Sequence, residues 1–291
     1  MIYLESFRLP SAQEEQQMLM DGRKRFRALT LNTDPYPFRL FMDRVTSEFT
    51  FDPITIFYGG NGSGKSTLLN LIANKLNLKR ATLFNEGDFF DEYTTLCTHT
   101  SKPIKPSNAE MIASDDIFDH LQAKRSINKG ISKHRTELYN DYYDLRKNEE
   151  RFTLRSLDDY ERLKEINDAK RSSYSKFASS RTPMKLSEHS NGESAYEYFL
   201  EKLLDEGLYL LDEPENSLSA PWQIKLAEYI EESARFYKCQ FIISTHSPFI
   251  LSIKGAKIYN LDSIPVGVQK WTELENVRVY YDFFQKHKDK F

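Results

Sequence analysis

Residues 54–67 read ITIFYGGNGSGKST. The first five form a continuous apolar and β-branched run, which predicts a strand buried on both faces of a parallel sheet. Beyond the stretch, apolar residues recur at helical spacing between Leu68 and Leu76, so the glycine-rich loop lies between a strand and a helix. That arrangement is the context that a phosphate-binding loop requires.

Such a loop binds phosphate mainly through its backbone. The glycines let successive N–H groups turn inward around the β- and γ-phosphates, while the start of the following helix adds its dipole. We expect Lys65 to neutralise phosphate oxygens and the Ser66 hydroxyl to ligate Mg²⁺. The predicted site for ATP and Mg²⁺ consists of Gly59, Gly60, Asn61, Gly62, Ser63, Gly64, Lys65, Ser66 and Thr67.

Two further motifs supply side chains for hydrolysis. The apolar run 208–211 ends in Asp212, expected to hold the Mg²⁺ shell, and Glu213, expected to accept a proton from the attacking water. His246 follows the apolar run 241–245, so its ring should emerge at the same carboxyl edge of the sheet and meet the γ-phosphate. The catalytic candidates are therefore Lys65, Glu213 and His246. The remaining histidines are interpreted as structural or merely exposed, with no metal-ligand cluster: His99, His120, His134, His189 and His287.

The pattern of elements favours a doubly wound α/β fold with a helical insertion. A capping box at Ser11 predicts a short helix that ends before Gly22. Near the carboxyl end we expect strands over 257–261 and 266–271 and a closing helix over 276–287. The predicted division is 1–114 and 190–291 for the nucleotide-binding core and 115–189 for a helical subdomain, which is too short for a long coiled-coil arm.

Bulk properties limit the partners. The chain has 291 residues, 40% of them apolar, and a net charge of −3, which gives no long-range attraction to nucleic acid or anionic lipid. Residues 121–185 nevertheless carry 16 Lys/Arg against 10 Asp/Glu, so a solvated helical face and an anion-binding surface both stay open. Only two cysteines, no membrane span and no export segment predict a cytoplasmic protein.

In these motifs the sequence resembles ATPases of the ABC class, in the soluble branch of chromosome-maintenance, DNA-repair and RecF-like heads, and most of all small stand-alone bacterial ATPases with an AAA domain. The matching stretches are the glycine loop (Walker A), LYLLDEPENSLS (Walker B), QFIISTHSPFIL with its switch histidine, GAKIYNLD and HSNGES. The resemblance covers most of residues 54–70 and 186–262. It implies that two heads pair face to face around two ATP molecules.

The same resemblance identifies a signature loop that reaches the γ-phosphate of the opposite head, through Ser190, Gly192 and Glu193. A helix start with serine and glycine also suits an anion on physical grounds, and an ordinary helix cap is the alternative. Four positions depart from the usual pattern. They are His189 and Asn191 in place of leucine and glycine, Asp115 in place of the metal-binding glutamine, and Ser219 in place of an aspartate. Tyr36 and Phe38 are left unassigned between adenine stacking and packing beneath a turn.

Mg²⁺-dependent ATP hydrolysis with ATP-driven dimerisation, coupled to an unidentified partner in DNA repair or phage defence, is the leading hypothesis. One alternative is a nucleotide-gated scaffold with negligible turnover. Another is the ATPase subunit of a membrane transporter, which co-purification with an integral membrane protein would favour. Nucleic acid remains an open partner, since the charge pattern permits it without requiring it.

Overall fold

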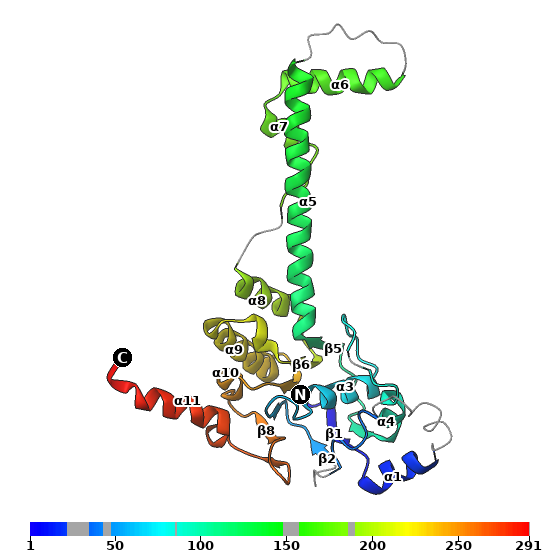
Figure 1. Ribbon diagram of the computed structural model, residues 1–291, viewed down its shortest axis with the longest axis vertical. Coiled ribbons are helices and arrows are strands. Elements are labelled where there is room, and N and C mark those ends of the chain that lie inside the picture. The colour runs from blue at the N-terminus through cyan, green and yellow to red at the C-terminus, as the bar shows by residue number, and fades with distance from the viewer. Residues whose placement is uncertain (22–34, 43–47, 85, 148–156, 186–189, 291) are drawn as a thin grey trace. The chain divides into compact units, whose positions relative to one another are not determined.

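The computed structural model describes all residues except 22–34, 43–47, 85, 148–156, 186–189 and 291. It divides the chain into two compact units, one of Met1–Phe118 with Asn191–Phe291 and one of Asp119–Ser190 (Figure 1). The domain division expected from the sequence, with a subdomain over 115–189, stays a prediction. No described helix is long and apolar enough to cross a lipid bilayer.

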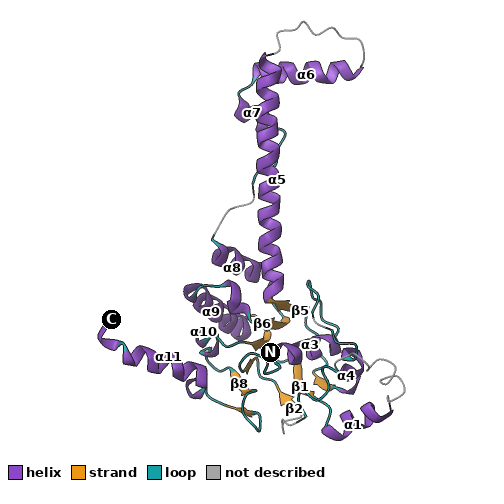
Figure 2. Ribbon diagram, in the orientation of Figure 1, coloured by secondary structure: helices purple, strands orange, loops and turns teal. Residues whose placement is uncertain are grey.

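A six-stranded sheet forms the centre of the first unit (Figure 2). Its order is β5 (Asn108–Ala113), β6 (Gly207–Asp212), β7 (Gln240–Ser244), β3 (Ile54–Tyr58), β8 (Lys257–Asn260) and β9 (Gly267–Val268). The first five strands are parallel and β9 is antiparallel to β8. All residues of β3 and β7 are buried, as expected of strands covered on both faces. The predicted α/β fold class is therefore confirmed.

A smaller antiparallel sheet has the order β2 (Glu48–Thr50), β1 (Leu4–Arg8) and β4 (Thr98–Ser101). Aromatic side chains join it to the central sheet. Phe49 meets the rings of Phe57 and Tyr259 edge-on at centroid distances of 5.3 and 5.2 Å. Such edge-to-face pairs add to the stabilisation from burial alone. One apolar core consequently spans both sheets and includes Phe57 of β3, the strand that precedes the glycine loop.

Helices complete the first unit: α1 (Ala12–Asp21), α3 (Lys65–Lys75), α4 (Phe90–Leu96), α8 (Asn191–Lys202), α9 (Ala220–Phe236), α10 (Pro248–Leu251) and α11 (Glu275–Lys286). The capping box of α1 is present, because Ser11 Oγ accepts from Glu14 N at 3.3 Å and Ser11 N donates to Glu14 Oε2 at 2.7 Å. Gly22 lies outside the described residues. Short 3₁₀ turns occur at η1 (Pro214–Ser217), η2 (Trp271–Glu273) and η3 (Lys288–Lys290).

The strand expected over 266–271 is much shorter than predicted. Only Gly267 and Val268 pair, and their partners are Asn260 and Tyr259 of β8. In the antiparallel register the residues after Val268 run back along β8, and Gln269 N still donates to the Ile258 carbonyl at 3.0 Å. The chain then turns into η2 at Trp271.

The second unit is helical, as predicted for this part of the chain. The helix α5 (Ser114–Lys147) begins in the first unit and runs for 34 residues, a length of about 50 Å. Such a long single helix was not expected from the sequence, which indicated only that this segment is too short for a long coiled-coil arm. Two shorter helices follow, α6 (Leu157–Arg171) and α7 (Tyr174–Ser179). The three helices share a small core, made of Leu138 and Tyr142 from α5, Ala169 from α6 and Phe177 from α7.

Candidate functional site

The glycine loop leaves the buried end of β3, and α3 begins at Lys65. Gly62 and Gly64 have φ values of 79° and 92°, in the left-handed region that glycine adopts without strain. A β-carbon on Gly64 would also come within 3.0 Å of the Phe41 ring. The loop conformation thus depends on glycine at 64, both for its backbone angles and for its packing.

The Lys65 ammonium points back into its own loop. It donates to the carbonyl oxygens of Gly59 at 2.8 Å and Gly60 at 3.1 Å, and it lies 3.6 Å from Glu213 Oε1. Its side chain is only 4% exposed. A buried cation held this way is already positioned beside the loop's backbone, where an anion between loop and lysine would meet both.

Ser66 and Asp212 bring hard oxygen atoms together. Ser66 Oγ donates to Asp212 Oδ1 at 3.0 Å, and the Ser244 hydroxyl makes a second, short hydrogen bond to the same oxygen. Burial raises the pKa of the Asp212 carboxyl, and these hydrogen bonds oppose that shift. A hydroxyl next to a carboxylate suits Mg²⁺, which commonly takes one or two protein ligands and completes its shell with phosphate and water. Within the described ranges there is no group of three or more His, Cys, Asp or Glu side chains suited to a metal.

Glu213 and His246 lie side by side beyond the strand ends. Glu213 has φ 46°, and its backbone N–H donates to the Ser244 carbonyl at 3.0 Å, so β7 holds the turn after β6. His246 Nδ1 lies 3.8 Å from Glu213 Oε1. The three candidate catalytic side chains therefore lie together, with Lys65 and His246 both close to the Glu213 carboxylate.

The candidate signature residues begin a different element. Ser190 is exposed, Gly192 and Glu193 are half-buried in the first turn of α8, and His189 lies outside the described residues. A β-carbon on Gly192 would come within 2.8 Å of Trp222 Cδ1. The indole of Trp222 therefore packs directly on Gly192, the glycine of the candidate signature loop.

The positions that depart from the family pattern differ in their surroundings. Asp115 is exposed at the start of α5, whereas its neighbour Asp116 is buried and accepts from the backbone N–H groups of Ala113 and Thr82 at 2.7 and 2.8 Å. Ser219 precedes α9 and makes no side-chain cap. Between the two aromatic candidates, Phe38 is buried against Tyr93, while the Tyr36 hydroxyl lies 2.8 Å from Thr67 Oγ1.

Sequence reasoning missed several residues that contact the site. Glu215 binds the loop that carries His246, Gln223 binds Ser247 of that loop, and Asp262 accepts from Gly60 N in the glycine loop. The closeness of Glu215 to Asp212 in sequence could have pointed to it. Nothing local marks Gln223 or Asp262, whose contacts span 24 and 202 residues of chain.

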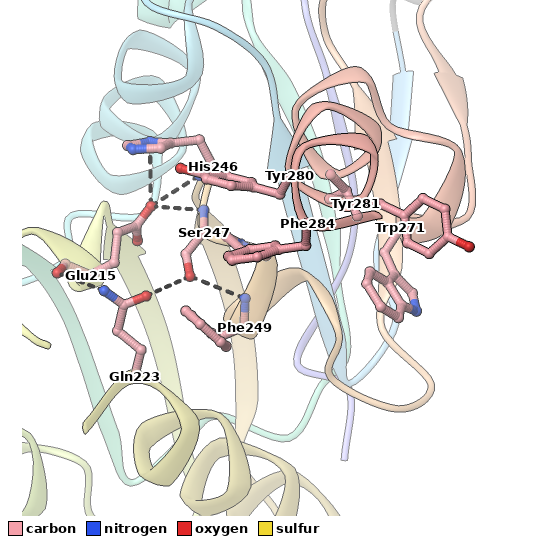
Figure 3. Close-up of a pocket in the computed structure, with 11 residues that line it drawn as sticks. Glu215, Gln223, His246, Ser247, Phe249, Trp271, Tyr280, Tyr281 and Phe284 are labelled. Atoms are coloured by element: carbon pink, nitrogen blue, oxygen red, sulfur yellow. Dashed lines mark hydrogen bonds and ion pairs between the residues drawn. The ribbon is translucent and has the colours of Figure 1, made fainter. Parts of the chain in front are cut away.

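An apolar pocket of about 470 Å³ adjoins the loop of His246 (Figure 3). Glu215, Gln223, His246 and Ser247 line its polar side. The opposite side is aromatic and includes Trp271, Tyr280, Tyr281 and Phe284, three of them from α11. Asn276, at the start of α11, donates through Nδ2 to the His246 carbonyl at 2.9 Å. The closing helix is therefore hydrogen-bonded to the switch-histidine loop.

Comparison with solved structures finds several folds of low sequence identity. An Smc head domain with an extended coiled coil from Pyrococcus furiosus, bound to the C-terminal domain of ScpA, is 12% identical, with 99% of this chain and 100% of that chain covered and a TM-score of 0.43. An SMC head domain from Thermotoga maritima is 14% identical over 92% and 99%, with a TM-score of 0.40. An ATP-binding cassette, dimeric in a post-hydrolysis state with ADP and phosphate, is 15% identical over 78% and 90%, with a TM-score of 0.36.

Among curated proteins, no sequence matches the chain at a significant level. A family model does match, over residues 74–252, and its description is "AAA domain, putative AbiEii toxin, Type IV TA system". This range begins just beyond the glycine loop and includes Asp212, Glu213 and His246. The resemblance to ABC-class ATPases with an AAA domain, inferred from the sequence, is confirmed. Since the model matches more than half of the sequence, the chain belongs to this AAA-domain family of P-loop ATPases.

Proposed function

We propose that this protein binds ATP with Mg²⁺ in the glycine loop, hydrolyses it, and pairs with a second copy in its ATP-bound state. The observation that carries the proposal is the meeting of Lys65, Glu213 and His246 beside the Ser66–Asp212 pair. A nucleotide hydrolase needs cations, metal ligands and a base at one place, and these five side chains belong to those classes.

Each side chain has a defined task in the proposal. Lys65 leaves the carbonyl oxygens of the loop and neutralises the β- and γ-phosphates. Ser66 and Asp212 hold Mg²⁺, which when bound offsets phosphate charge. Glu213 takes a proton from the attacking water, and His246 donates a hydrogen bond to the γ-phosphate.

Pairing of two copies extends the same reasoning to α8. Ser190, Gly192 and Glu193 stand at or beside the start of a 12-residue helix, where backbone N–H groups and the helix dipole favour an anion. In the pair, this end approaches the γ-phosphate held by the other copy. ATP thus acts as the contact between the subunits, and its hydrolysis releases them.

The cytoplasm is the proposed location. Both cysteines, Cys97 and Cys239, are free and buried. Burial raises the pKa of the Cys97 thiol to about 12, so this thiol stays protonated and unreactive. A reducing compartment would leave such thiols as they are.

Phosphate release by the purified protein tests the proposed activity. We expect turnover that requires both ATP and Mg²⁺, and we expect Lys65→Ala to lose nucleotide binding because phosphate charge goes uncompensated. Unchanged affinity in Lys65→Ala would contradict the assignment of the glycine loop. Tight ATP binding without measurable phosphate release would instead favour a nucleotide-gated scaffold.

A further inference from the structure

One carboxylate joins the two loops that carry Glu213 and His246. Glu215 lies in η1, directly after the β6 loop, and is only 6% exposed. Its Oε1 atom accepts from Thr245 Oγ1 at 2.6 Å. The same atom accepts from His246 N at 2.9 Å and from Ser247 N at 3.2 Å (Figure 3). Three consecutive residues that follow β7 therefore donate to a single carboxylate oxygen in η1.

The backbone of His246 is held from two sides. Glu215 accepts from its N–H, and Asn276 Nδ2 donates to its carbonyl oxygen at 2.9 Å. Its neighbour Ser247 donates through Oγ to Gln223 Oε1 at 2.7 Å. With both peptide groups bonded, the half-exposed imidazole can turn about its side-chain bonds while its backbone stays in place.

The imidazole itself lies between two carboxylates. Its Nδ1 atom is 3.4 Å from Glu215 Oε1 and 3.8 Å from Glu213 Oε1. Glu215 is therefore the carboxylate that contacts His246 through both ring and backbone, while Glu213 faces Lys65 as well. The two acids, two residues apart in sequence, share the imidazole but differ in their other contacts: Glu213 lies near Lys65, and Glu215 accepts from Thr245.

Stability alone is a poor explanation for a carboxylate at this position. Burial raises the pKa of the Glu215 carboxyl, because loss of hydration destabilises the charged form. Hydrogen bonds from three donors offset that penalty. The carboxylate does fix the position of the loop, because its removal would leave the Thr245 hydroxyl and the His246 N–H without this acceptor and allow the loop to move.

We infer that Glu215 is a positioning residue that sets the place of His246 relative to Glu213. The inference rests on the proposed function, since it assigns to Glu215 the task of presenting His246 to the nucleotide. Glu215 acts through His246, and no described contact joins it to the glycine loop.

Steady-state kinetics of two Glu215 variants test the inference. Glu215→Ala removes the acceptor of the Thr245 hydroxyl and of the His246 N–H, so kcat should fall at least tenfold. The Kd for ATP should stay within about twofold, because Lys65 and the glycine loop are untouched. Glu215→Gln keeps an oxygen acceptor of the same shape and should restore most of the lost kcat. A kcat unchanged in Glu215→Ala would overturn the inference, and so would a Glu215→Gln variant as impaired as Glu215→Ala.

Thr245→Val provides a second route if Glu215→Ala does not fold. Valine keeps the volume of threonine and removes the hydroxyl, which donates to Glu215 Oε1 at 2.6 Å and accepts from Ser247 N at 3.0 Å. We expect a smaller fall in kcat, about three- to fivefold, and the double variant with Glu215→Ala should lose less than the product of the two single effects, because both remove the Thr245–Glu215 contact. Effects that multiply in the double variant would contradict a shared path through this contact.

A spectroscopic measurement separates this inference from the proposed activity. Imidazole resonances of His246, assigned with His246→Gln, should shift and broaden in Glu215→Ala or Thr245→Val and return toward the parent position in Glu215→Gln. Absence of ATPase activity in the parent protein would remove the proposed function and leave this measurement intact. Resonances identical in all variants would overturn the positioning role even if the parent is an active ATPase.

Discussion

The Asp262 carboxylate accepts a hydrogen bond of 2.7 Å from the backbone N–H of Gly60. Asp262 follows β8, which pairs with β3 in the sheet. Asp212 ends β6, on the other side of β3, so the two carboxylates approach the phosphate loop from opposite sides. A hydrogen bond here orders the loop. The negative charge that makes the bond also repels an incoming polyphosphate, and the two effects have opposite consequences for nucleotide affinity.

Asp262→Asn separates these effects, because asparagine keeps an acceptor oxygen and loses the charge. We expect ATP to bind about two- to fivefold more tightly, because an exposed charge such as that of Asp262 interacts with another charge by up to about 1 kcal/mol. Fluorescent-nucleotide titration measures the change, which should shrink at high salt. Asp262→Ala, the control, loses the acceptor too and should show less gain. An Asp262→Asn protein that binds ATP more weakly would mean that the contact orders the loop more than its charge repels the nucleotide.

Gly192→Ala should destabilise the protein even though alanine is the better helix former. The new β-carbon would lie 2.8 Å from Trp222 Cδ1, and an indole cannot yield as the end of a flexible chain would. Overpacking costs about 1 to 3 kcal/mol, against a helix-propensity gain of about 1 kcal/mol or less. We expect a net loss of about 1 kcal/mol in urea unfolding, with a changed Trp222 emission. Gly130→Ala, where a β-carbon meets nothing within 4 Å, is the matched control and should be neutral or stabilising. Equal stability of the two variants would show that the Trp222 contact is soft.

Much of the fold could be predicted because its elements carry local patterns. The strands β3, β6 and β7 are short apolar runs, each followed by polar residues at the sheet edge, and α9 and α11 have helical periodicity. The strand expected over 266–271 is too long, because only Gly267 and Val268 form ladder pairs before the chain turns into η2 at Trp271.

The site shows the same division between local and distant information. Asp212, Glu213 and His246 each follow or end an apolar strand, so the sequence alone predicts that they lie at one sheet edge, and the structure has Glu213 and His246 close together. Gln223 and Asp262 act through partners 24 and 202 residues away, so only the folded chain reveals them. Glu215 falls between these cases. It sits in a readable motif, but its task depends on three donors from another loop.

Asp212→Asn should stabilise the protein without nucleotide while abolishing activity. Burial and the neighbouring Glu213 raise the pKa of Asp212, whereas hydrogen bonds from Ser244 and Ser66 and the charge of Arg80 lower it. A carboxyl whose pKa is raised in the folded state binds more protons there than when unfolded, so its contribution to stability is full below pH 3.8 and declines as pH rises through the folded pKa. At pH 7 the charged form is the costly one, and asparagine avoids that cost.

We expect Asp212→Asn to gain about 1 kcal/mol at pH 7 and to lose that advantage in acid. Thermal unfolding of both proteins between pH 4 and pH 8, without Mg²⁺ or nucleotide, measures the difference. Adding Mg²⁺ and ATP should reverse the order, because only the parent binds the metal fully. A variant less stable than the parent at pH 7 would mean that the hydrogen bonds of Ser66 and Ser244 require the charge.

The last prediction concerns pairing, and it depends on keeping ATP intact. Glu213→Gln preserves the shape of the side chain, weakens the 3.6 Å ion pair with Lys65 and cannot take a proton from water. ATP and Mg²⁺ should therefore bind and accumulate unhydrolysed. If Ser190 and Gly192 contact the γ-phosphate held by a second copy, the accumulated state must be a dimer.

Light scattering should show Glu213→Gln passing from monomer toward dimer when ATP and Mg²⁺ are added, with ADP having no such effect. Ser190→Arg in the same background should abolish the shift, because a bulky side chain at the start of α8 would keep this helix end from the opposing nucleotide. Ser252→Arg, an exposed serine just past α10, controls for added charge and bulk and should leave the dimer intact. Glu213→Gln that binds ATP yet stays monomeric at tens of micromolar would remove the shared site, because the ATP-bound state would then exist without a second copy. Parent-rate hydrolysis by the same variant would instead remove Glu213 as the base, since an amide cannot take the proton.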